Sequence, residues 1–308
     1  MNILLIYDHY VVCAGRYLTT ALQNLGHTTY TAGRCFGTAI WGTHMNYRFM
    51  HTPSAPPTLD ELDDLDLIII ADSDPFYLSL ERLKQFGLSV KTLDATPVVT
   101  FAMDNHVRDY SFDGCDHHFV AHRSVSEMDT KRKDITHIGC GFLEDFLDPD
   151  YAALDSTKYH GPSNWHLRPY DVAFVGVPYH QRMSVIRALR QAGIKVFTFT
   201  GLIYENFAKA YRMSKISLNY SANFDLNQRF FETAALGCHV MTNALPDLQG
   251  RSDIPLDAYQ VYSTPQDAVV VAEGILEVGT PPPQDTSWLQ EHTWENKAMQ
   301  VLGWVRRQ

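Results

Sequence analysis

The sequence has 308 residues, a length that suits two domains of about 150 residues each. Hydrophobic residues make up 45% of the chain and charged residues 19%, so it can bury two ordinary cores and lacks the composition of a disordered protein. The formal net charge of −10 argues against a broad nucleic-acid footprint, because binding along phosphates requires clustered lysine and arginine. A local basic groove stays possible.

The sequence predicts neither a membrane span nor a signal peptide. It contains no apolar run of about 18 residues, and residues 2–7 are typical of a buried strand, without a basic leader or cleavage site. The five cysteines are odd in number and never spaced as C-x-x-C. We expect them to be small buried side chains in a reducing cytoplasm, with no catalytic or metal-binding role.

Strands and helices are expected to alternate along the first half, as in an open, doubly wound parallel sheet. Strands are predicted at 3–7, 28–31, 67–71 and 97–101, with weaker candidates at 118–121 and 135–138, and helices at 17–25 and 77–86. The irregular, aromatic-rich stretch between them, residues 33–57, is a long loop of the kind that often carries function.

The second half repeats this alternation. Strands are predicted at 172–175, 195–199, 216–220, 239–242 and 259–262, and helices at 180–192, 204–213, 228–236, 265–276 and 288–306. The expected organisation is an N-terminal Rossmann-like domain at 1–148, a Pro- and Gly-containing linker at 149–169, a C-terminal Rossmann-like domain at 170–284 and a helical segment at 285–308.

One strand-loop-helix-strand unit carries the strongest functional signal. Its helix begins after Asn227, a plausible N-cap, and stops at Gly237. The N-terminus of such a helix carries unpaired N–H groups, and Arg229 adds a full positive charge, so an anion such as a diphosphate would be held there. Glu232 would accept hydrogen bonds from vicinal hydroxyls. The alternative is a surface ion pair between Arg229 and Glu232, worth at most ~0.5 kcal/mol.

The same unit resembles a known family. The sequences KISLN at 215–219 and RFFETAALGC at 229–238 are similar to the signature of the CgeB-like (spore maturation protein B-like) glycosyltransferases, relatives of the retaining group-1 enzymes. Similar features recur at 170–176 and 292–297, and the resemblance covers most of residues 165–305. It implies the GT-B fold, in which two Rossmann-like domains face a central cleft and a C-terminal helix crosses back to the first domain.

The resemblance implies that the C-terminal domain binds a nucleotide-diphosphate sugar. Donor-binding residues are then expected at Gly176, Arg182, Gly201, Tyr204, Asn219, Arg229, Phe230, Glu232 and Thr233. Arg182 would contact the diphosphate, although a solvated helix-start arginine is the alternative. Tyr204 would lie near the nucleobase, or simply pack. The E-x7-E pattern of retaining relatives is only half present, because Glu232 fits its second acid whereas Phe224 stands in place of the first.

Candidate catalytic and acceptor-binding residues lie in the first half. Asp104 and His106 follow a predicted strand and would act as a general base and as a hydrogen-bonding or proton-transfer group, with a capped turn and an exposed histidine as the alternative. The acceptor would meet residues that follow the first strand, which are His9, Tyr10, Gly15 and Arg16.

Two metal-site patterns compete with this interpretation. Asp72 and Asp74 follow a buried strand as the D-x-D motif of GT-A enzymes does, but a strand-to-helix cap explains them equally. His117 and His118 would face opposite sides of a strand, and no acid or cysteine set completes a site with them and His122.

We therefore expect a metal-independent glycosyltransferase, hexosyl or pentosyl, that needs no cofactor beyond its donor. Retention of configuration is implied by the resemblance alone. The acceptor stays open among a small molecule, a glycan, a protein and a modified nucleic-acid base, and so does the oligomeric state. The alternatives are a metal-dependent transferase using Asp72 and Asp74, and a non-catalytic protein that closes on a nucleotide sugar.

Overall fold

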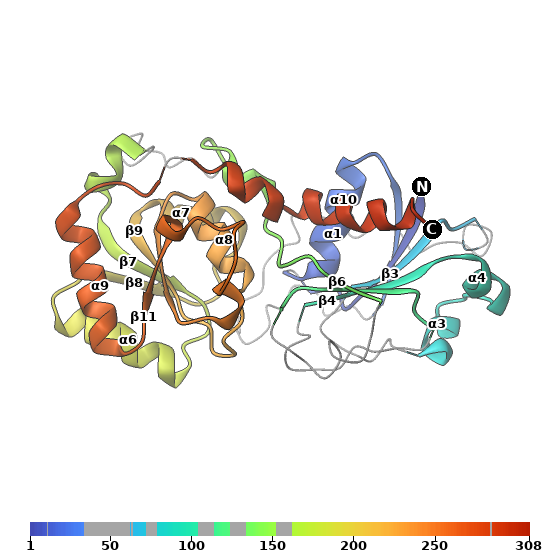
Figure 1. Cartoon of the computed structure of the whole chain (residues 1–308), viewed down its shortest axis with the longest axis horizontal. Coiled ribbons are helices and arrows are strands. Elements are labelled where there is room, and N and C mark those ends of the chain that lie inside the picture. Colours follow the sequence, from blue (N-terminus) through green and yellow to red (C-terminus); the bar gives the residue numbers. More distant parts are fainter. Residues whose placement is uncertain are drawn as a thin grey trace. The chain divides into compact units, whose positions relative to one another are not determined.

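The computed structural model describes residues 1–10, 12–33, 62, 64–71, 79–103, 114–123, 134–151, 162–283 and 285–308. Two compact units divide the chain. The first comprises Met1–Gly141 together with Trp294–Gln308, and the second is Phe142–Thr293. Each unit is built on a sheet whose described strand pairings are all parallel (Figure 1).

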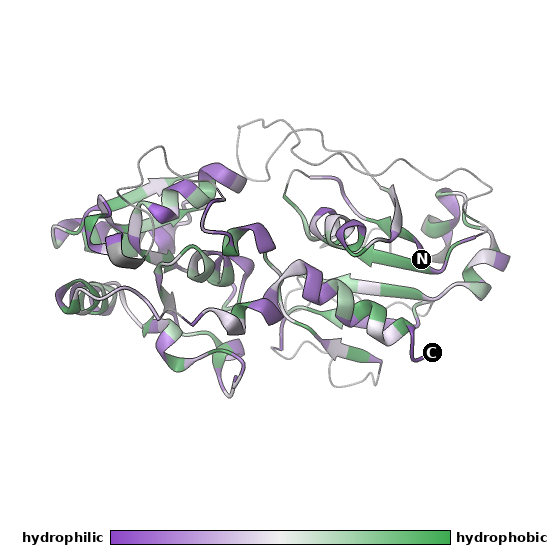
Figure 2. Cartoon of the chain, turned by 90° about the horizontal axis from the view of Figure 1, so that it is seen from above, coloured by the Kyte–Doolittle hydropathy of each residue, from purple (hydrophilic) through white to green (hydrophobic). Residues whose placement is uncertain are grey.

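The sheet of the first unit has the strand order β2-β1-β3-β4-β5-β6. Its strands are β1 (Asn2–Ile6), β2 (Thr28–Ala32), β3 (Leu67–Ala71), β4 (Val98–Ala102), β5 (His117–Val120) and β6 (Ile135–His137), and its described helices are α1 (Ala14–Asn24), α3 (Leu80–Gln85), α4 (Val90–Ala95) and α10 (Trp294–Val305). Every residue of β3 and β4 is buried, as expected for central strands covered on both faces. The strands near the N-terminus are coloured largely as hydrophobic in Figure 2.

The sheet of the second unit has the order β11-β10-β9-β7-β8. Its strands are β7 (Tyr170–Val175), β8 (Val196–Phe199), β9 (Ser214–Asn219), β10 (His239–Asn243) and β11 (Tyr259–Tyr262), and its helices are α6 (His180–Gln191), α7 (Tyr204–Arg212), α8 (Gln228–Ala235) and α9 (Pro265–Val278). Short 3-10 turns include η2 (Glu144–Leu147), η4 (Pro162–Leu167) and η7 (Ser287–His292). This is a doubly wound order. Strand β8 is added on one side of β7, whereas β9, β10 and β11 are added on the other, so the order of the strands reverses between β7 and β9.

The two strands at that reversal, β7 and β9, separate before their carboxyl ends. Their pairing ends at Ala173 and Ser217, whereas β7 stays paired with β8 as far as Val175. The Val175 amide donates instead to the buried hydroxyl of Tyr211, at 3.1 Å. In doubly wound sheets ligands bind outside the carboxyl ends at this point.

The C-terminal helix belongs to the first unit. In Figure 1, α10 runs beside α1, and the two helices are in contact. Trp294 is 1% exposed, and its ring lies 5.7 Å from that of Tyr17 and 5.6 Å from that of Phe101. A Cβ at Gly141 would come within 2.6 Å of the same indole. The crossing of this helix back to the first domain is thus confirmed.

One prediction of secondary structure was wrong, and one helix was missed. The single helix expected at 288–306 is divided into η7 and α10, because Thr293 is extended and forms a parallel bridge with Phe142. Helix α4 was not predicted, although Ser89 caps it by accepting a hydrogen bond from the Thr92 amide at 3.0 Å. Most of the loop expected at 33–57 lies outside the described residues. Within the described part, no helix has the length and apolar character needed to cross a membrane.

Candidate functional site

The candidate site begins at helix α8, which follows the carboxyl end of β9. Asn227 is the N-cap residue by its backbone angles, but its side chain accepts no hydrogen bond from the helix. The first N–H groups of α8 are therefore not satisfied by a side-chain cap, and they carry the partial positive charge of a helix start. At the other end Gly237 has φ +72, with the Cys238 amide bonded to Thr233 O and the Gly237 amide to Ala234 O. This is the expected glycine stop, in the form of a Schellman motif.

Arg229, in the first turn of α8, has a guanidinium group that makes no hydrogen bond or ion pair within the described part of the chain. Its Nε is buried and has no hydrogen-bond partner among the residues that the structure describes. Its Cζ lies 5.4 Å from the centroid of the Phe174 ring. A Cβ at Gly176 would stand 2.9 Å from Nη2 of Arg229, so the missing side chain of Gly176 makes room for this group.

Arg182, near the start of α6, lies beside Arg229. Its Nε donates to Tyr220 O at 3.1 Å and its Nη1 to Val177 O at 3.0 Å, and it is only 9% exposed. The rings of Tyr179 and Phe174 lie 4.7 and 5.4 Å from its Cζ. Burial, followed by the positive charge of Arg229, lowers the pKa of Arg182 to about 10. The alternative of a solvated arginine therefore does not describe this residue.

Two positive side chains thus meet at the carboxyl edge of β7 and β9. Neither Arg182 nor Arg229 forms an ion pair with a carboxylate among the described residues, although like charges in a half-buried place repel each other. The only hydrogen-bond acceptors that Arg182 uses there are backbone carbonyls. Such a place is suited to an anion that neutralises both groups, and guanidinium matches phosphate in geometry.

Glu232 stands one turn further along α8. Gln228 donates from Nε2 to its Oε1 at 2.6 Å. Burial raises the pKa of the Glu232 carboxyl to about 7, against the opposing effects of the Gln228 hydrogen bond and the charge of Arg229. Within the described residues no ion pair joins Glu232 to Arg229, so the alternative of a surface ion pair is wrong.

The loop between β9 and α8 is held against β10 by backbone contacts of Ser221. The Ser221 amide donates to Asn243 Oδ1 at 2.8 Å, and Asn243 Nδ2 donates back to Ser221 O at 3.1 Å. The Ser221 hydroxyl bonds the carboxylate of Asp225. Asn219, the last residue of β9, is fully buried, and its Oδ1 has no hydrogen-bond partner among the described residues.

Several of the expected donor-binding residues are buried within the second unit. Phe230 is 0% exposed and packs against Phe231 and Tyr259. Thr233 is also 0% exposed, and its hydroxyl donates to Arg229 O at 2.9 Å. Tyr204 is 4% exposed, so its ring offers no free face for stacking and packs instead. Gly201 has φ +86 and precedes α7. Phe230 thus belongs to the buried face of α8, and the Thr233 hydroxyl bonds the backbone of the first turn of this helix.

The expected acceptor residues lie together at the carboxyl end of β1, beside the reversal point between β1 and β3. His9 is buried and stacks on Tyr7, and its Nε2 is 3.3 Å from Ala32 O. Burial lowers its pKa. Arg16 is 2% exposed and donates from Nε to Tyr10 O at 3.0 Å. A Cβ at Gly15 would overlap the Tyr7 ring at 2.2 Å, so this position has no room for a side chain.

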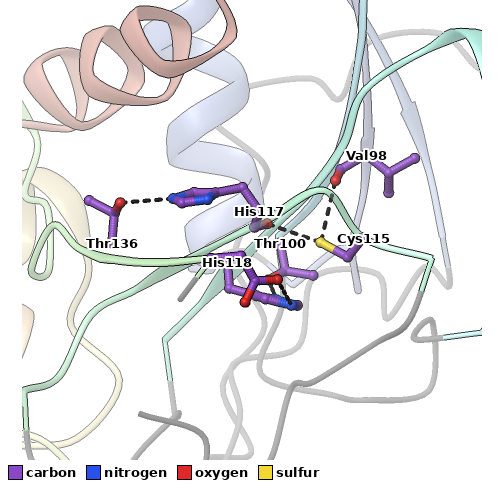
Figure 3. A network of polar contacts seen from close by, with 7 residues as sticks. Val98, Thr100, Cys115, His117, His118 and Thr136 are labelled. Carbon is purple, nitrogen blue, oxygen red and sulfur yellow. Dashed lines mark hydrogen bonds and ion pairs between the residues drawn. The ribbon is translucent and has the colours of Figure 1, made fainter. Parts of the chain in front are cut away.

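The other first-half candidates divide into two groups. Asp104, His106, Asp72 and Asp74 lie outside the described residues. His117 and His118 point to different sides of β5, as predicted (Figure 3). His117 Nε2 is 2.8 Å from Thr136 Oγ1, and His118 Nδ1 is 2.7 Å from Thr100 Oγ1. Among the residues that the structure describes, no three His, Cys, Asp or Glu side chains gather as metal ligands.

Sequence reasoning missed Gln228, Ser221 and Asn243. Gln228 was detectable, because a glutamine four residues before a glutamate on a helix places the two side chains together. The pairing of Ser221 with Asn243 joins two different strand ends, and no local pattern indicates it.

Comparison with known proteins agrees with this geometry. Residues 163–277, which include the two arginines and α8, match the family described as glycosyl transferase-like. No curated protein sequence matches the chain. Among solved structures, HepE from Anabaena in complex with UDP is similar with a TM-score of 0.62 and 10% identity over 100% of both chains.

Two further structures are similar over their whole lengths. An alpha-glucosyltransferase in complex with UDP and a 13-mer DNA containing a HMU base has a TM-score of 0.54 and 11% identity over 100% of both chains. The apo form of the lipopolysaccharide outer core galactosyltransferase WaaB has a TM-score of 0.52 and 11% identity, covering 98% of this chain and 100% of its own. These likenesses show that the fold is GT-B.

The match across the second unit defines the class of protein. It is a glycosyltransferase, and therefore an enzyme. The matched family model spans residues 163–277 only. The first unit is assigned to the GT-B fold by its structural similarity to solved structures.

Proposed function

We propose that this protein transfers a sugar from a nucleotide-diphosphate sugar to an acceptor hydroxyl, with retention of configuration and without a metal ion or another cofactor. The observation that carries the proposal is the pair Arg182 and Arg229, two adjacent guanidinium groups at the reversal point of the second sheet, neither of which forms an ion pair with a carboxylate among the described residues. A diphosphate supplies the negative charge that these groups lack.

In this proposal the arginines act on the leaving nucleotide. Negative charge grows on the β-phosphate as the bond to the sugar breaks, and Arg182, Arg229 and the start of α8 stabilise it. These groups perform the task that a divalent cation has in a D-x-D site. Glu232 accepts hydrogen bonds from the ribose hydroxyls of the nucleotide. The UDP complexes of HepE and of the alpha-glucosyltransferase support a nucleotide donor for this fold.

The finer assignment to the CgeB-like group rests on the sequences at 215–219 and 229–238. Retention is proposed on the same ground. Phe224, which replaces the first acid of E-x7-E, is 56% exposed in the structure, and no carboxylate stands at that position for the transferred sugar. Cytoplasmic location is proposed from cysteine use, and none of the four described cysteines forms a disulfide with another described residue.

For the acceptor side we propose Asp104 as the general base toward the acceptor hydroxyl and His106 as a group that hydrogen-bonds the sugar or assists proton transfer. His9, Tyr10, Gly15 and Arg16 would line the place where the acceptor binds. The last four residues lie at the corresponding reversal point of the first sheet, which supports this assignment. The class of acceptor stays open.

Donor binding and turnover test the proposal in separate steps. Thermal shift with UDP-, GDP-, ADP- and dTDP-sugars should reveal one donor that raises the melting temperature, because a ligand that binds only the folded state stabilises it. Release of the nucleotide in the presence of acceptors should then continue in EDTA. Absence of any stabilising donor would contradict the proposal. Binding without turnover would favour the non-catalytic alternative, and loss of turnover in EDTA would favour the metal-dependent one.

A further inference from the structure

The side chain of Gln228 has one contact that matters for the site. It is the first residue of α8, and its Nε2 donates to Oε1 of Glu232, four residues on, at 2.6 Å. This is the only hydrogen bond that the Glu232 carboxyl makes among the described residues. Oε2 accepts no hydrogen bond from a described residue and is not among the fully buried atoms of this half-buried side chain, so it stays available to a ligand.

Two side chains of α8, the cationic Arg229 and the neutral Gln228, compete in principle for the Glu232 carboxyl. Arg229, three residues before it, is at a spacing that commonly forms ion pairs on a helix. Its guanidinium group instead lies at the Phe174 ring and close to Gly176, where an added Cβ would stand 2.9 Å from Nη2. The neutral amide of Gln228 bonds one carboxylate oxygen of Glu232, and the guanidinium group of Arg229 stays at the Phe174 ring.

A glutamate side chain has three rotatable bonds, and fixing them costs conformational entropy. A carboxylate that a neutral donor already holds has lost this conformational entropy before the ligand binds. More of its interaction with the ligand therefore contributes to affinity. An ion pair with Arg229 would fix it too, but would also use the charge needed for the diphosphate.

We infer that Gln228 is a positioning residue of the donor site: it holds Oε1 of Glu232 so that Oε2 meets the hydroxyls of the nucleotide ribose, and it keeps Arg229 free for the diphosphate. This inference rests on the proposed function. It also assigns a specificity, because a carboxylate fixed in one direction separates a ribose, which has a 2′-hydroxyl, from a 2′-deoxyribose.

The test measures affinities for UDP, GDP and ADP, each beside its 2′-deoxy counterpart, by titration calorimetry. The wild-type protein should prefer one ribonucleotide over its deoxy form. Gln228→Ala should weaken binding of that ribonucleotide by roughly tenfold, the size expected for a hydrogen bond to a charged group, and leave the deoxy form nearly unchanged. The preference for ribose should therefore collapse.

A matched control lies on α10. Gln300 donates from Nε2 to Asn296 Oδ1 at 2.7 Å, a helix hydrogen bond with the same spacing of four residues. Gln300→Ala should change neither affinity. Gln228→Glu should bind the ribonucleotide still more weakly than Gln228→Ala, because two carboxylates then face each other.

The outcomes distinguish a failure of the proposed function from a failure of the role of Gln228. If the wild-type protein binds none of the nucleotides, the proposed function fails and the inference with it. If it binds a ribonucleotide and Gln228→Ala retains the wild-type preference for ribose, or weakens both forms by the same factor, the role of Gln228 is wrong while the proposed function stands.

Discussion

The guanidinium carbons of Arg182 and Arg229 each lie 5.4 Å from the centroid of the Phe174 ring, one reaching it from α6 and the other from α8. A phenyl ring attracts cations through its electron-rich face, and this attraction contributes about 0.5–1 kcal/mol at exposed sites. The ring thus brings two like charges to one place without neutralising them. Stability gains little from such an arrangement, whereas binding of a diphosphate gains from both charges.

Removing one of the two charges should separate function from stability. We expect Arg229→Ala to lower donor turnover by at least two orders of magnitude, because it removes a full charge from the leaving diphosphate. The melting temperature should stay level or rise, since the substitution also relieves repulsion with Arg182 and deletes the partnerless Nε. Steady-state kinetics and thermal denaturation measure the two effects.

Arg187→Ala is the control for this experiment. Arg187 lies on α6 with Arg182, is exposed, and donates to Met183 O of its own helix. Its loss should leave turnover unchanged. If turnover were also unchanged in Arg229→Ala, the proposal that the diphosphate binds beside Arg229 would be contradicted.

Gly176 should be intolerant of even the smallest side chain. A methyl group there would meet Arg229 Nη2 at 2.9 Å and Phe174 Cζ at 3.2 Å. We expect Gly176→Ala to displace Arg229 and to reduce donor affinity several-fold or more, which titration with the nucleotide diphosphate measures.

Gly274→Ala supplies the comparison. Gly274 lies within α9, and a Cβ there would meet no other group within 4 Å. Replacing it should stabilise the protein by about 0.5–1 kcal/mol, the usual preference of a helix for alanine over glycine, and leave donor affinity unchanged. Equal donor affinities in the two variants would contradict the close approach at Gly176.

The sequence predicted those features that depend on neighbours along the chain. β3 was predictable because five consecutive apolar residues are typical of a strand buried on both faces, and α8 because Asn227 and Gly237 bound it. The contact of Arg182 with Tyr220 O was not, since it joins residues 38 positions apart. The break at Thr293 escaped prediction for the same reason, because the bridge to Phe142 that causes it is long-range.

Within the candidate site the same division holds. The sequence indicated Arg229 and Glu232 from helix position and charge, but it also indicated Phe230 and Thr233, which follow the same motif and are buried. Motif membership does not say which face of a helix meets the ligand. That depends on the sheet against which the helix packs.

The pH dependence of stability should reveal Glu232. Burial raises the pKa of this carboxyl from 4.5 to about 7 in the folded protein. Between these two values the folded state holds a proton that the unfolded state has lost, so the contribution of Glu232 to the free energy of unfolding falls as pH rises from about 4.5 to about 7. Glu232→Gln should remove that decline, which denaturant titrations of both proteins at several pH values measure. A decline of the same size in Glu232→Gln would assign it to other groups.

Donor affinity should respond to pH in the opposite direction. The charged carboxylate is the stronger acceptor for ribose hydroxyls, so affinity should increase as pH rises through about 7. Phosphate ionisation contributes in the same range, and Glu232→Gln keeps that contribution while losing the carboxylate. The difference between the two titration curves therefore belongs to Glu232. Coincident curves would contradict a contact between this carboxyl and the ribose.

The junction of α10 with the first unit makes a prediction about stability alone. Trp294 is 1% exposed and packs against the rings of Tyr17 and Phe101. Its indole also fills the position that a Cβ at Gly141 would take. Replacing it with alanine removes a large ring from a packed interior, which costs about 3–5 kcal/mol. Because its partners all belong to the first unit, the loss should fall on that unit.

Hydrogen exchange followed by mass spectrometry locates the effect. In Trp294→Ala we expect faster exchange in β1, α1 and β4, and unchanged exchange in β7, β9 and α8. Met299→Ala, a substitution of a 49% exposed side chain on the same helix, should change neither set. Faster exchange confined to the second unit would show that α10 stabilises the other half of the chain, and it would overturn the assignment of the C-terminal helix to the first unit.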